Sequence, residues 1–212
     1  MQLVEKYFPD LTPEQRERFD MLPALYSDWN AKVNVVSRQD IENLEVRHVL
    51  HSLAIAKAFA FKADAKVLDL GTGGGFPGIP LAILLPEVQF MLIDGTGKKI
   101  AVVQEIIRAL GLTNAEARHI RAEEMKMRGA FDFVVTRAVA PLDKLLAWGQ
   151  PLLSRKHRHA YPNGTIALKG GDLRAEAAAL PGRMKDYMEV FPVQNFFQEP
   201  WFEEKWVVYM QG

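Results

Sequence analysis

A glycine-rich loop and the carboxylates beside it are the residues best suited to chemistry. The loop runs from Gly71 to Gly78, with the sequence GTGGGFPG, and directly follows the apolar run 66–70. In an open α/β sheet, glycines at the end of a strand let the backbone approach a bound cofactor closely. Asp69 stands just before the loop, and Asp94 ends the next apolar run. Together these residues predict a cofactor site at the carboxyl edge of a sheet.

The loop matches two cofactor patterns. Residues 73–78 fit the GxGxxG fingerprint of dinucleotide-binding proteins, whereas residues 69–75 fit the DxGxGxG loop of many methyltransferases. Asp94 does not separate the two, because a carboxylate at that strand end can accept both ribose hydroxyls in either class. Asp69 favours the second pattern, since its charge would repel a pyrophosphate but attract the cationic methionine end of a methyl donor. The loop therefore favours S-adenosylmethionine over a nicotinamide cofactor.

Alternating apolar runs and helical patterns surround the loop and predict how it is held. We expect strands at 66–70, 88–94, 131–136 and 165–169, with helices at 98–110 and 142–153. Strands separated by helices of this length pair in parallel through right-handed crossovers, with helices on both faces of the sheet. The tail 204–210 is expected to pair antiparallel at an edge. The predicted fold is a doubly wound, mostly parallel α/β sheet of the Rossmann-like type.

The first sixty-odd residues are expected to be helical and to precede the sheet. Residues 12–15, TPEQ, have the composition of a capping box with proline in the first turn. Pro23 lies inside the helical pattern that follows, so we expect a bend or a break there. A second helix is expected from about residue 40 to 61. We therefore divide the chain into an N-terminal helical extension, 1–62, and a Rossmann-like methyltransferase-type domain, 63–212.

Composition excludes several classes of mechanism. The chain has 212 residues, no cysteine, and 26 basic side chains against 26 acidic ones. Without cysteine there are no disulfides, thiolate metal sites or cysteine nucleophiles, and the histidines lack the spacing of a metal site, so we expect no metal. With no net charge, binding to nucleic acid has to rely on a local patch. No apolar stretch suits a signal peptide or a membrane span, so we expect a cytoplasmic protein.

Longer motifs carry a resemblance to one family. The segment 69–80, DLGTGGGFPGIP, is far more specific than its glycines alone, and further matches follow along most of the chain. These matches are Arg47-His48-Val49-Leu50-His51-Ser52, Asp94 with Gly97-Lys98-Lys99, Ala122-Glu123-Glu124, Thr136-Arg137-Ala138 and Leu168-Lys169-Gly170. In order and spacing they resemble the glucose-inhibited division protein B family, the bacterial 16S ribosomal RNA guanine-N7 methyltransferases. The resemblance implies a Rossmann-like fold with S-adenosylmethionine as the methyl donor.

The resemblance also implies which residues hold the donor. Gly71 and Phe76 would lie against it, Ala122 and Glu123 would lie near its adenine, and Arg137 would lie beside the same pocket. The full set of expected donor-binding residues is Asp69, Gly71, Gly73, Gly75, Phe76, Asp94, Ala122, Glu123 and Arg137. Arg137 is also the candidate catalytic residue, and it could contact the donor's carboxylate, the acceptor base or an internal carboxylate.

Guanine N7 suits a methyltransferase that has no general base. N7 carries a lone pair and no proton, so the enzyme mainly aligns donor and acceptor and excludes water. The segment 136–141, TRAVAP, lacks the Asn/Asp-Pro-Pro-aromatic motif in which amino-directed methyltransferases resemble one another. N7 faces the deep major groove of A-form RNA, so the target guanine is expected in a loop. His48 is expected to have a packing or capping role.

Basic residues are the candidates for holding the RNA backbone, because phosphate contacts fix register. They are Arg47, Lys98, Lys99, Arg155, Lys156, Arg158 and Lys169. The stretch 154–159 is longer and more basic than the short turn expected there, and residues 95–96 differ from the family's usual ones. Neutral net charge favours a protein-coated substrate, 16S ribosomal RNA within the small ribosomal subunit, and we expect the enzyme to be a monomer.

Two other functions stay open on the sequence alone. A nicotinamide-dependent dehydrogenase could use the GxGxxG spacing, although the chain has no visible constellation, such as Tyr-x-x-x-Lys, to handle a substrate proton. A non-catalytic RNA-binding module could use the glycine loop for structure alone. Such a module would not need an intact donor pocket, so binding of the donor separates it from an enzyme.

Overall fold

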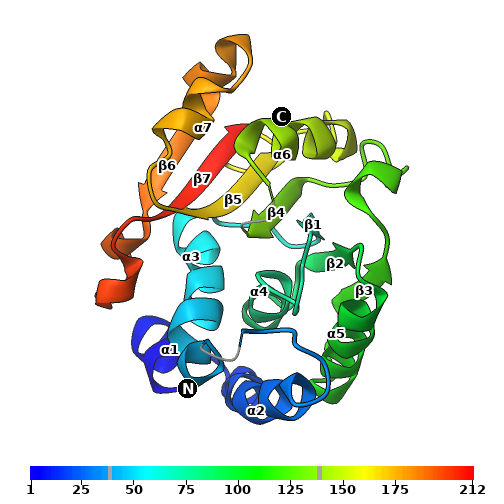
Figure 1. Cartoon of the computed structure of the whole chain (residues 1–212), viewed down its shortest axis with the longest axis vertical. Coiled ribbons are helices and arrows are strands. Elements are labelled where there is room, and N and C mark those ends of the chain that lie inside the picture. Colours follow the sequence, from blue (N-terminus) through cyan, green and yellow to red (C-terminus); the bar gives the residue numbers. More distant parts are fainter. Residues whose placement is uncertain (38–39, 138–139) are drawn as a thin grey trace.

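Seven strands form a single sheet within residues 1–37, 40–137 and 140–212, which are those that the computed structural model describes (Figure 1). The strands are β1 (Lys66–Leu70), β2 (Gln89–Asp94), β3 (Ala115–His119), β4 (Phe133–Arg137), β5 (Gly164–Gly170), β6 (Met188–Pro192) and β7 (Lys205–Gln211). Their order across the sheet is β3-β2-β1-β4-β5-β7-β6. The first five pair in parallel, and β7 runs antiparallel to both β5 and β6. The predicted doubly wound, mostly parallel sheet is confirmed.

The antiparallel end of the sheet holds one strand more than predicted. The tail forms β7 and pairs antiparallel with β5, as expected, but β6 pairs along its other side. The outermost strand is therefore β6, whose sequence MEVFP contains a charge and a proline and has no fully buried residue. A strand that is half-exposed on both faces lacks the apolar alternation that marks a strand in sequence.

Helices cover both faces of the sheet (Figure 1). One face carries α2 (Pro13–Asn30), α3 (His51–Ala58), α4 (Gly78–Leu84) and α5 (Gly97–Ala109), with the short α1 (Gln2–Tyr7) beside them. The other face carries α6 (Leu142–Gly149) and α7 (Arg174–Ala178). Short helical turns complete the chain: η1 (Ile41–Asn43), η2 (Glu45–Leu50), η3 (Ala122–Glu124), η4 (Gln150–Leu152), η5 (Gly182–Tyr187), η6 (Val193–Asn195) and η7 (Pro200–Phe202).

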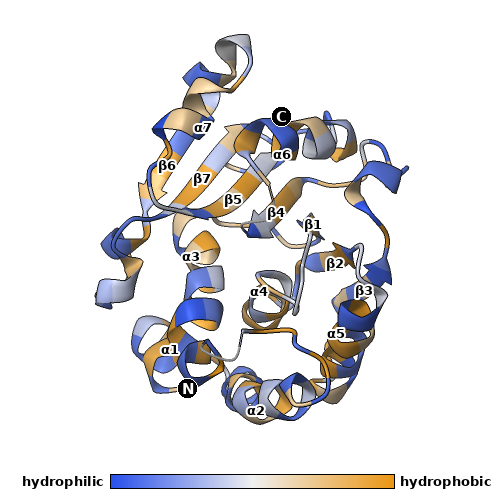
Figure 2. Cartoon of the chain, viewed as in Figure 1, coloured by the Kyte–Doolittle hydropathy of each residue, from blue (hydrophilic) through white to orange (hydrophobic). Residues whose placement is uncertain are grey.

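Alternation along the strands divides the core between these two faces. In β1, Val67 packs with the helices of the first face, and Leu68 and Leu70 pack with those of the second. Successive side chains of a strand point to opposite faces, so a strand covered on both sides is apolar along its whole length. Figure 2 shows the hydrophobic colouring concentrated on the central strands and on the sides of the helices that face them.

The N-terminal helices belong to the same core as the sheet. Thr12 and Gln15 form the predicted capping box, and α2 then continues through Pro23 without the predicted break. Pro23 lies on the exposed side of the helix, where its ring meets solvent, while Phe19 and Tyr26 are buried on the side that packs against α4. The domain boundary near residue 62 stays a prediction. One hydrophobic core joins the N-terminal helices before this residue to the sheet and helices after it.

The second predicted helix, from residue 40 to 61, is divided in the structure. It consists of the 3₁₀ turn η1, the π-helical turn η2 and the α-helix α3. Periodicity predicts apolar spacing but does not distinguish one type of helical turn from another, and single π turns are frequent at functional sites. Arg47 and His48 lie on η2, which places this irregular turn next to the sheet edge described below.

Replacing Thr12 with alanine removes the acceptor of the Gln15 N–H and half of the capping box. We expect the free energy of unfolding, measured by urea titration, to fall by about 1 kcal/mol. Thr12→Ser keeps the hydroxyl and should retain wild-type stability. Equal losses in the two variants would contradict a role for the hydroxyl in capping α2.

Candidate active site

The sheet places two chain segments side by side at its carboxyl edge. From β1 the chain runs outward to β2 and β3, and from β4 it runs the other way, so the order reverses between β1 and β4. Ligands of open α/β sheets bind at such a switch point. The glycine loop follows β1 and Arg137 ends β4, and the Thr136 hydroxyl joins the two strand ends by donating to Leu70 O at 2.8 Å.

The backbone of the glycine loop uses conformations that favour glycine. Gly71, Gly73 and Gly75 have φ angles of +72°, +57° and +98°. A Cβ on Gly75 would lie 2.4 Å from Ile79 Cδ1, whereas a Cβ on Gly73 would have nothing within 4 Å. Gly75 is therefore required for packing against α4, and Gly73 borders open space in which a ligand can approach the backbone.

Asp69 is a fully buried carboxylate around which the loop folds. Its Oδ2 accepts hydrogen bonds from the Thr72 hydroxyl at 2.6 Å and from the Gly78 N–H at 2.8 Å. Burial raises the pKa of Asp69 to about 7, although these two donors and the nearby Arg137 act in the opposite direction. Its Oδ1 is buried and has no hydrogen-bond partner in the described part of the chain. This oxygen would gain a partner if a bound ligand brought a cationic or N–H donor into contact with it.

Asp94 connects the loop to the next strand. Its two carboxylate oxygens accept from Gly73 N at 2.9 Å and from Thr96 N at 2.8 Å. The residue is half-buried at the end of β2, as predicted. Each oxygen retains a second lone pair, so the carboxylate can hold the loop and still accept from a ribose hydroxyl.

An aromatic residue from the N-terminal helices fixes the loop from behind. The Tyr26 hydroxyl of α2 donates to Gly74 O at 2.6 Å, and its ring stacks on Phe76 with centroids 4.9 Å apart. Tyr26 is spaced in the sequence like a residue on the apolar side of a helix, which indicates a core position but gives no sign of this second role. A hydrogen bond between residues 48 apart in the chain depends on tertiary packing, which periodicity does not report.

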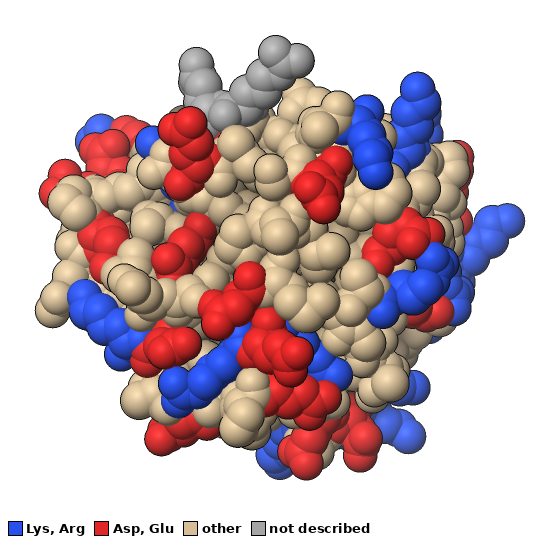
Figure 3. Space-filling model, turned by 90° about the horizontal axis from the view of Figure 1, so that it is seen from below, with Lys and Arg blue, Asp and Glu red and all other residues tan. Residues whose placement is uncertain are grey.

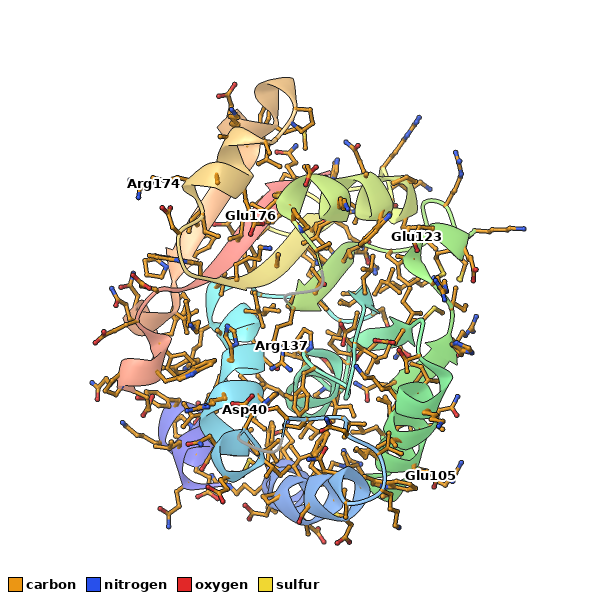
Figure 4. All side chains as sticks on the ribbon, in the orientation of Figure 1. Asp40, Glu105, Glu123, Arg137, Arg174 and Glu176 are labelled. Carbon is orange, nitrogen blue, oxygen red and sulfur yellow. The ribbon has the colours of Figure 1, made fainter. Side chains whose placement is uncertain are left out.

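Arg137 lies between the glycine loop and the π-helical turn η2, near the centre of Figure 4. Its Cζ is 5.0 Å from the centroid of the Phe76 ring, a cation–π contact. Its Nη2 lies 2.9 Å from His48 Nδ1, and its Nη1 donates to Arg47 O at 3.4 Å. Burial lowers the pKa of Arg137 to about 10, so the side chain is still charged at neutral pH.

The contact with Arg137 assigns the protonation state of His48. A guanidinium only donates, so Nδ1 of the imidazole must accept and the remaining hydrogen must be on Nε2. Burial, and then the charge of Arg137, lower the pKa of His48 to about 3. His48 is therefore neutral, and the centroid of its ring lies 5.0 Å from that of the Phe76 ring, in agreement with the packing role expected for it.

A pocket of about 380 Å³ opens beside Arg137. It is lined by Asp40, Arg47, His48, His51, Arg137, Leu168, Lys169, Gly170, Trp201 and Lys205. Three of its basic residues, Arg47, Arg137 and Lys169, were predicted as site residues from the sequence, whereas His51, Trp201 and Lys205, which belong to α3, η7 and β7, were not. The family motif that contains His51 was the one sequence signal for these three, because no local pattern shows that the topology brings the C-terminal segment to this edge.

The predicted adenine residues lie on the other side of the loop. Ala122 and Glu123 form the turn η3 after β3, with Ala122 half-buried and Glu123 exposed. Figure 4 shows Glu123 well separated from Arg137. Lys98 and Lys99 begin α5 directly after Asp94, so they flank the same edge. The structure thus brings the predicted donor residues together along one edge.

The basic stretch near residue 156 lies elsewhere. Arg155, Lys156 and Arg158 are exposed in the connection that leads to the start of β5. Arg158 pairs with Asp132 at 3.0 Å, and Asp132 directly precedes β4. These residues are at the amino edge of the parallel strands, opposite the glycine loop, so their contact with RNA stays a prediction that the topology does not support.

Lys169 lies at the correct edge but is already engaged. It is 8% exposed, and its Nζ contacts Glu176 at 2.7 Å and Ala140 O at 2.9 Å. An ammonium group held in this way is poorly placed to reach a phosphate.

Ala138, the last residue of the motif 136–138, lies outside the described residues. Among those that are described, no cluster of His, Cys, Asp or Glu could hold a metal ion, and no helix is long and apolar enough to cross a membrane.

Comparison with known proteins agrees with this geometry. The family model described as rRNA small subunit methyltransferase G (GidB) matches residues 15–196. The chain belongs to the rRNA small subunit methyltransferase G family. It is 54% identical over 211 residues to the ribosomal RNA small subunit methyltransferase G of Bacteroides thetaiotaomicron, covering 100% of each chain. The corresponding protein of Bacteroides fragilis is 53% identical over 210 residues, or 99% of each chain.

A solved structure supports the fold. A SAM-dependent methyltransferase from Aquifex aeolicus superposes with a TM-score of 0.57 and 18% identity, over 82% of this chain and 98% of that chain. The family model and the relatives confirm the family predicted from the motifs and the class of enzyme, an S-adenosylmethionine-dependent methyltransferase. Family membership removes the dehydrogenase and the non-catalytic RNA-binding module as readings of the glycine loop.

The residues present fit S-adenosylmethionine. The free Oδ1 of Asp69 suits an ammonium group, and the open space over Gly73 admits a ligand against the backbone. Asp94 offers carboxylate lone pairs at the strand end where a ribose is expected. The same features would be unfavourable for a pyrophosphate, because the carboxylate would repel it.

Replacing Asp69 with asparagine should change how stability depends on pH. The pKa of Asp69 in the folded protein, about 7, lies above its ordinary value of 3.8, so the ionised carboxylate is less favourable in the folded state. Its contribution therefore becomes more destabilising as pH rises between these two values. We expect Asp69→Asn to gain stability relative to the wild type over that range, measured by urea unfolding without ligand. A difference independent of pH would rule out the raised pKa.

Replacing Asp94 with alanine removes both the anchor of Gly73 and the expected ribose acceptor. We expect the dissociation constant for S-adenosylhomocysteine to rise by the equivalent of about 1.5–3 kcal/mol, the range for hydrogen bonds to a charged group. Asp143→Ala, at an exposed position of α6, is the control and should bind normally. Unchanged affinity in Asp94→Ala would exclude Asp94 from the donor site.

Proposed function

We propose that this methyltransferase transfers a methyl group to N7 of a guanine in a loop of 16S ribosomal RNA. The observation that carries the proposal is the state of the three groups that could act as bases in the pocket beside Arg137, which we take as the acceptor pocket. Nδ1 of His48 faces the Arg137 guanidinium at 2.9 Å, and Asp40 is paired with Arg47 at 2.6 Å. His51 is buried, and burial lowers its pKa well below the ordinary value, so it is a weak base. An acceptor atom with a lone pair and no proton needs none of them, and guanine N7 is such an atom.

The donor side of the proposal uses the glycine loop. S-adenosylmethionine supplies a methyl group on a sulfonium centre. We assign its methionine ammonium group to Asp69, its ribose hydroxyls to Asp94, and its adenine to Ala122 and Glu123. The backbone from Gly71 to Phe76 would line the space between them. These residues hold the donor in place so that the methyl carbon and N7 can align, which is the main requirement of an in-line displacement.

Arg137 acts on the acceptor side in this proposal. It lines the pocket and is fixed by Phe76, His48 and the backbone of η2. Arginine commonly recognises guanine through O6 and N7. Because N7 must be free to attack, we assign Arg137 to O6 alone. This assignment gives a positioned donor for guanine without blocking the reacting atom, and it distinguishes guanine from adenine, which carries an amino group at that position.

The surface is consistent with a substrate that already carries protein. Basic and acidic side chains are interspersed over the face shown in Figure 3, so that face does not present a continuous basic surface. We propose the small ribosomal subunit or an assembling form of it as the substrate, with the enzyme acting as a cytoplasmic monomer. Arg47, Lys98 and Lys99 flank the site and are the basic residues that we assign to the RNA backbone.

An RNA substrate made with 7-deazaguanosine tests the acceptor atom. This base has a carbon in place of N7 and keeps the other hydrogen-bonding groups, so it can fold and bind but has no nucleophile. We expect small subunits reconstituted from this RNA to accept radiolabelled methyl groups when the RNA is made with guanosine and to accept none when it is made with 7-deazaguanosine. Inosine substitution, which removes only the 2-amino group, should leave transfer in place. Transfer to the 7-deaza substrate would exclude N7.

A further inference from the structure

The acceptor pocket has an aromatic wall whose role is not accounted for by the donor site. Trp201 of η7 lines the pocket together with Arg137 and His51. η7 lies in the connection between β6 and β7, so the antiparallel end of the sheet supplies this wall and the parallel part supplies the donor loop. Figure 1 shows this connection returning along the outside of α3 towards α1.

The indole of Trp201 is held in a fixed orientation. The rings of His51 and Phe202 pack against it edge-on, with centroids at 5.2 Å and 5.3 Å and interplanar angles of 80° and 78°. Both of these neighbours are buried, whereas Trp201 is only half-buried. A large aromatic ring that is braced from the protein side and partly open on the pocket side presents a preformed stacking surface.

Positive charge accompanies this surface. Lys205 Nζ lies 5.0 Å from the centroid of the Trp201 ring, and Lys205 lines the same pocket. Arg47 lines the pocket as well, and Asp40 pairs with it. The ammonium group lies over the ring in a cation–π contact, and its flexible stem lets it move to the phosphate of a nucleotide whose base then stacks on the exposed face.

We propose that Trp201 is the stacking platform on which the extruded acceptor guanine lies during methyl transfer, with Lys205 contacting the phosphate of that nucleotide. The proposal rests on the proposed function and names the residues that hold its substrate. Enzymes that modify a base take it out of the stack, and proteins that read single-stranded RNA stack unpaired bases on aromatic side chains. The pocket volume of about 380 Å³ lies within the range of ~300–1,000 Å³ that is usual for small-molecule sites.

The test measures methyl transfer to small ribosomal subunits reconstituted from unmethylated RNA by Trp201→Leu, Trp201→Phe and the control Trp148→Ala. Leucine keeps apolar volume against His51 and Phe202 but has no aromatic face, and phenylalanine keeps a face. Trp148 is also half-buried, but it packs on the opposite face of the sheet, away from the pocket. The dissociation constant for S-adenosylhomocysteine and the thermal unfolding of each variant are measured in parallel.

We expect kcat/KM for RNA to fall by about tenfold or more in Trp201→Leu, as base–aromatic stacking predicts. Trp201→Phe should recover most of this loss, Trp148→Ala should behave as the wild type, and all variants should bind S-adenosylhomocysteine normally. Wild-type kinetics in a folded Trp201→Leu would overturn the stacking role and leave the proposed function in place. Equal losses in the leucine and phenylalanine variants would also overturn it. Absence of transfer by the wild type would overturn both.

Discussion

The buried carboxylate of Asp69 is the group on which the geometry of the active site depends. One of its oxygens binds both the Thr72 hydroxyl and the Gly78 N–H, so the beginning and the end of the glycine loop are tied to a single atom. Burying a carboxylate without enough partners is unfavourable, and the raised pKa of Asp69 expresses that cost. A cationic group at the free oxygen would relieve it. In the position proposed for it, the donor's ammonium group would satisfy an oxygen that folding leaves without a partner.

The helical extension is a structural part of this site. Tyr26 holds Gly74 by a hydrogen bond and stacks on Phe76, which in turn supports Arg137. Gln15, which closes the capping box of α2, also donates to Ile83 O and Leu84 O at the end of α4. The extension thus contacts both the glycine loop and the helix that follows it. This arrangement explains why the core is continuous across the boundary proposed from composition.

Local patterns predicted the features that local physics controls. Glycines that need positive φ, a capping box and buried apolar strands each leave a signature within a few residues, so the loop from Gly71 to Gly78 and the parallel strands around it could be anticipated. Features fixed by distant contacts could not. Lys169 and Arg158 were predicted as RNA contacts because they are basic. The sequence alone does not show that Glu176 pairs with Lys169, or that the topology places Arg158 at the amino edge of the sheet. Trp201 was missed for the same reason.

Calorimetric titration with S-adenosylhomocysteine, and with NAD in parallel, tests the donor site most directly. The ammonium group of the ligand should favour the ionised form of Asp69, whose pKa of about 7 makes part of it protonated at neutral pH. The account predicts saturable binding of S-adenosylhomocysteine with release of protons, seen as a dependence of the heat on the ionisation enthalpy of the buffer, and no binding of NAD. Binding of NAD, or binding of S-adenosylhomocysteine without any proton release near pH 7, would contradict the role of Asp69 at the centre of the site.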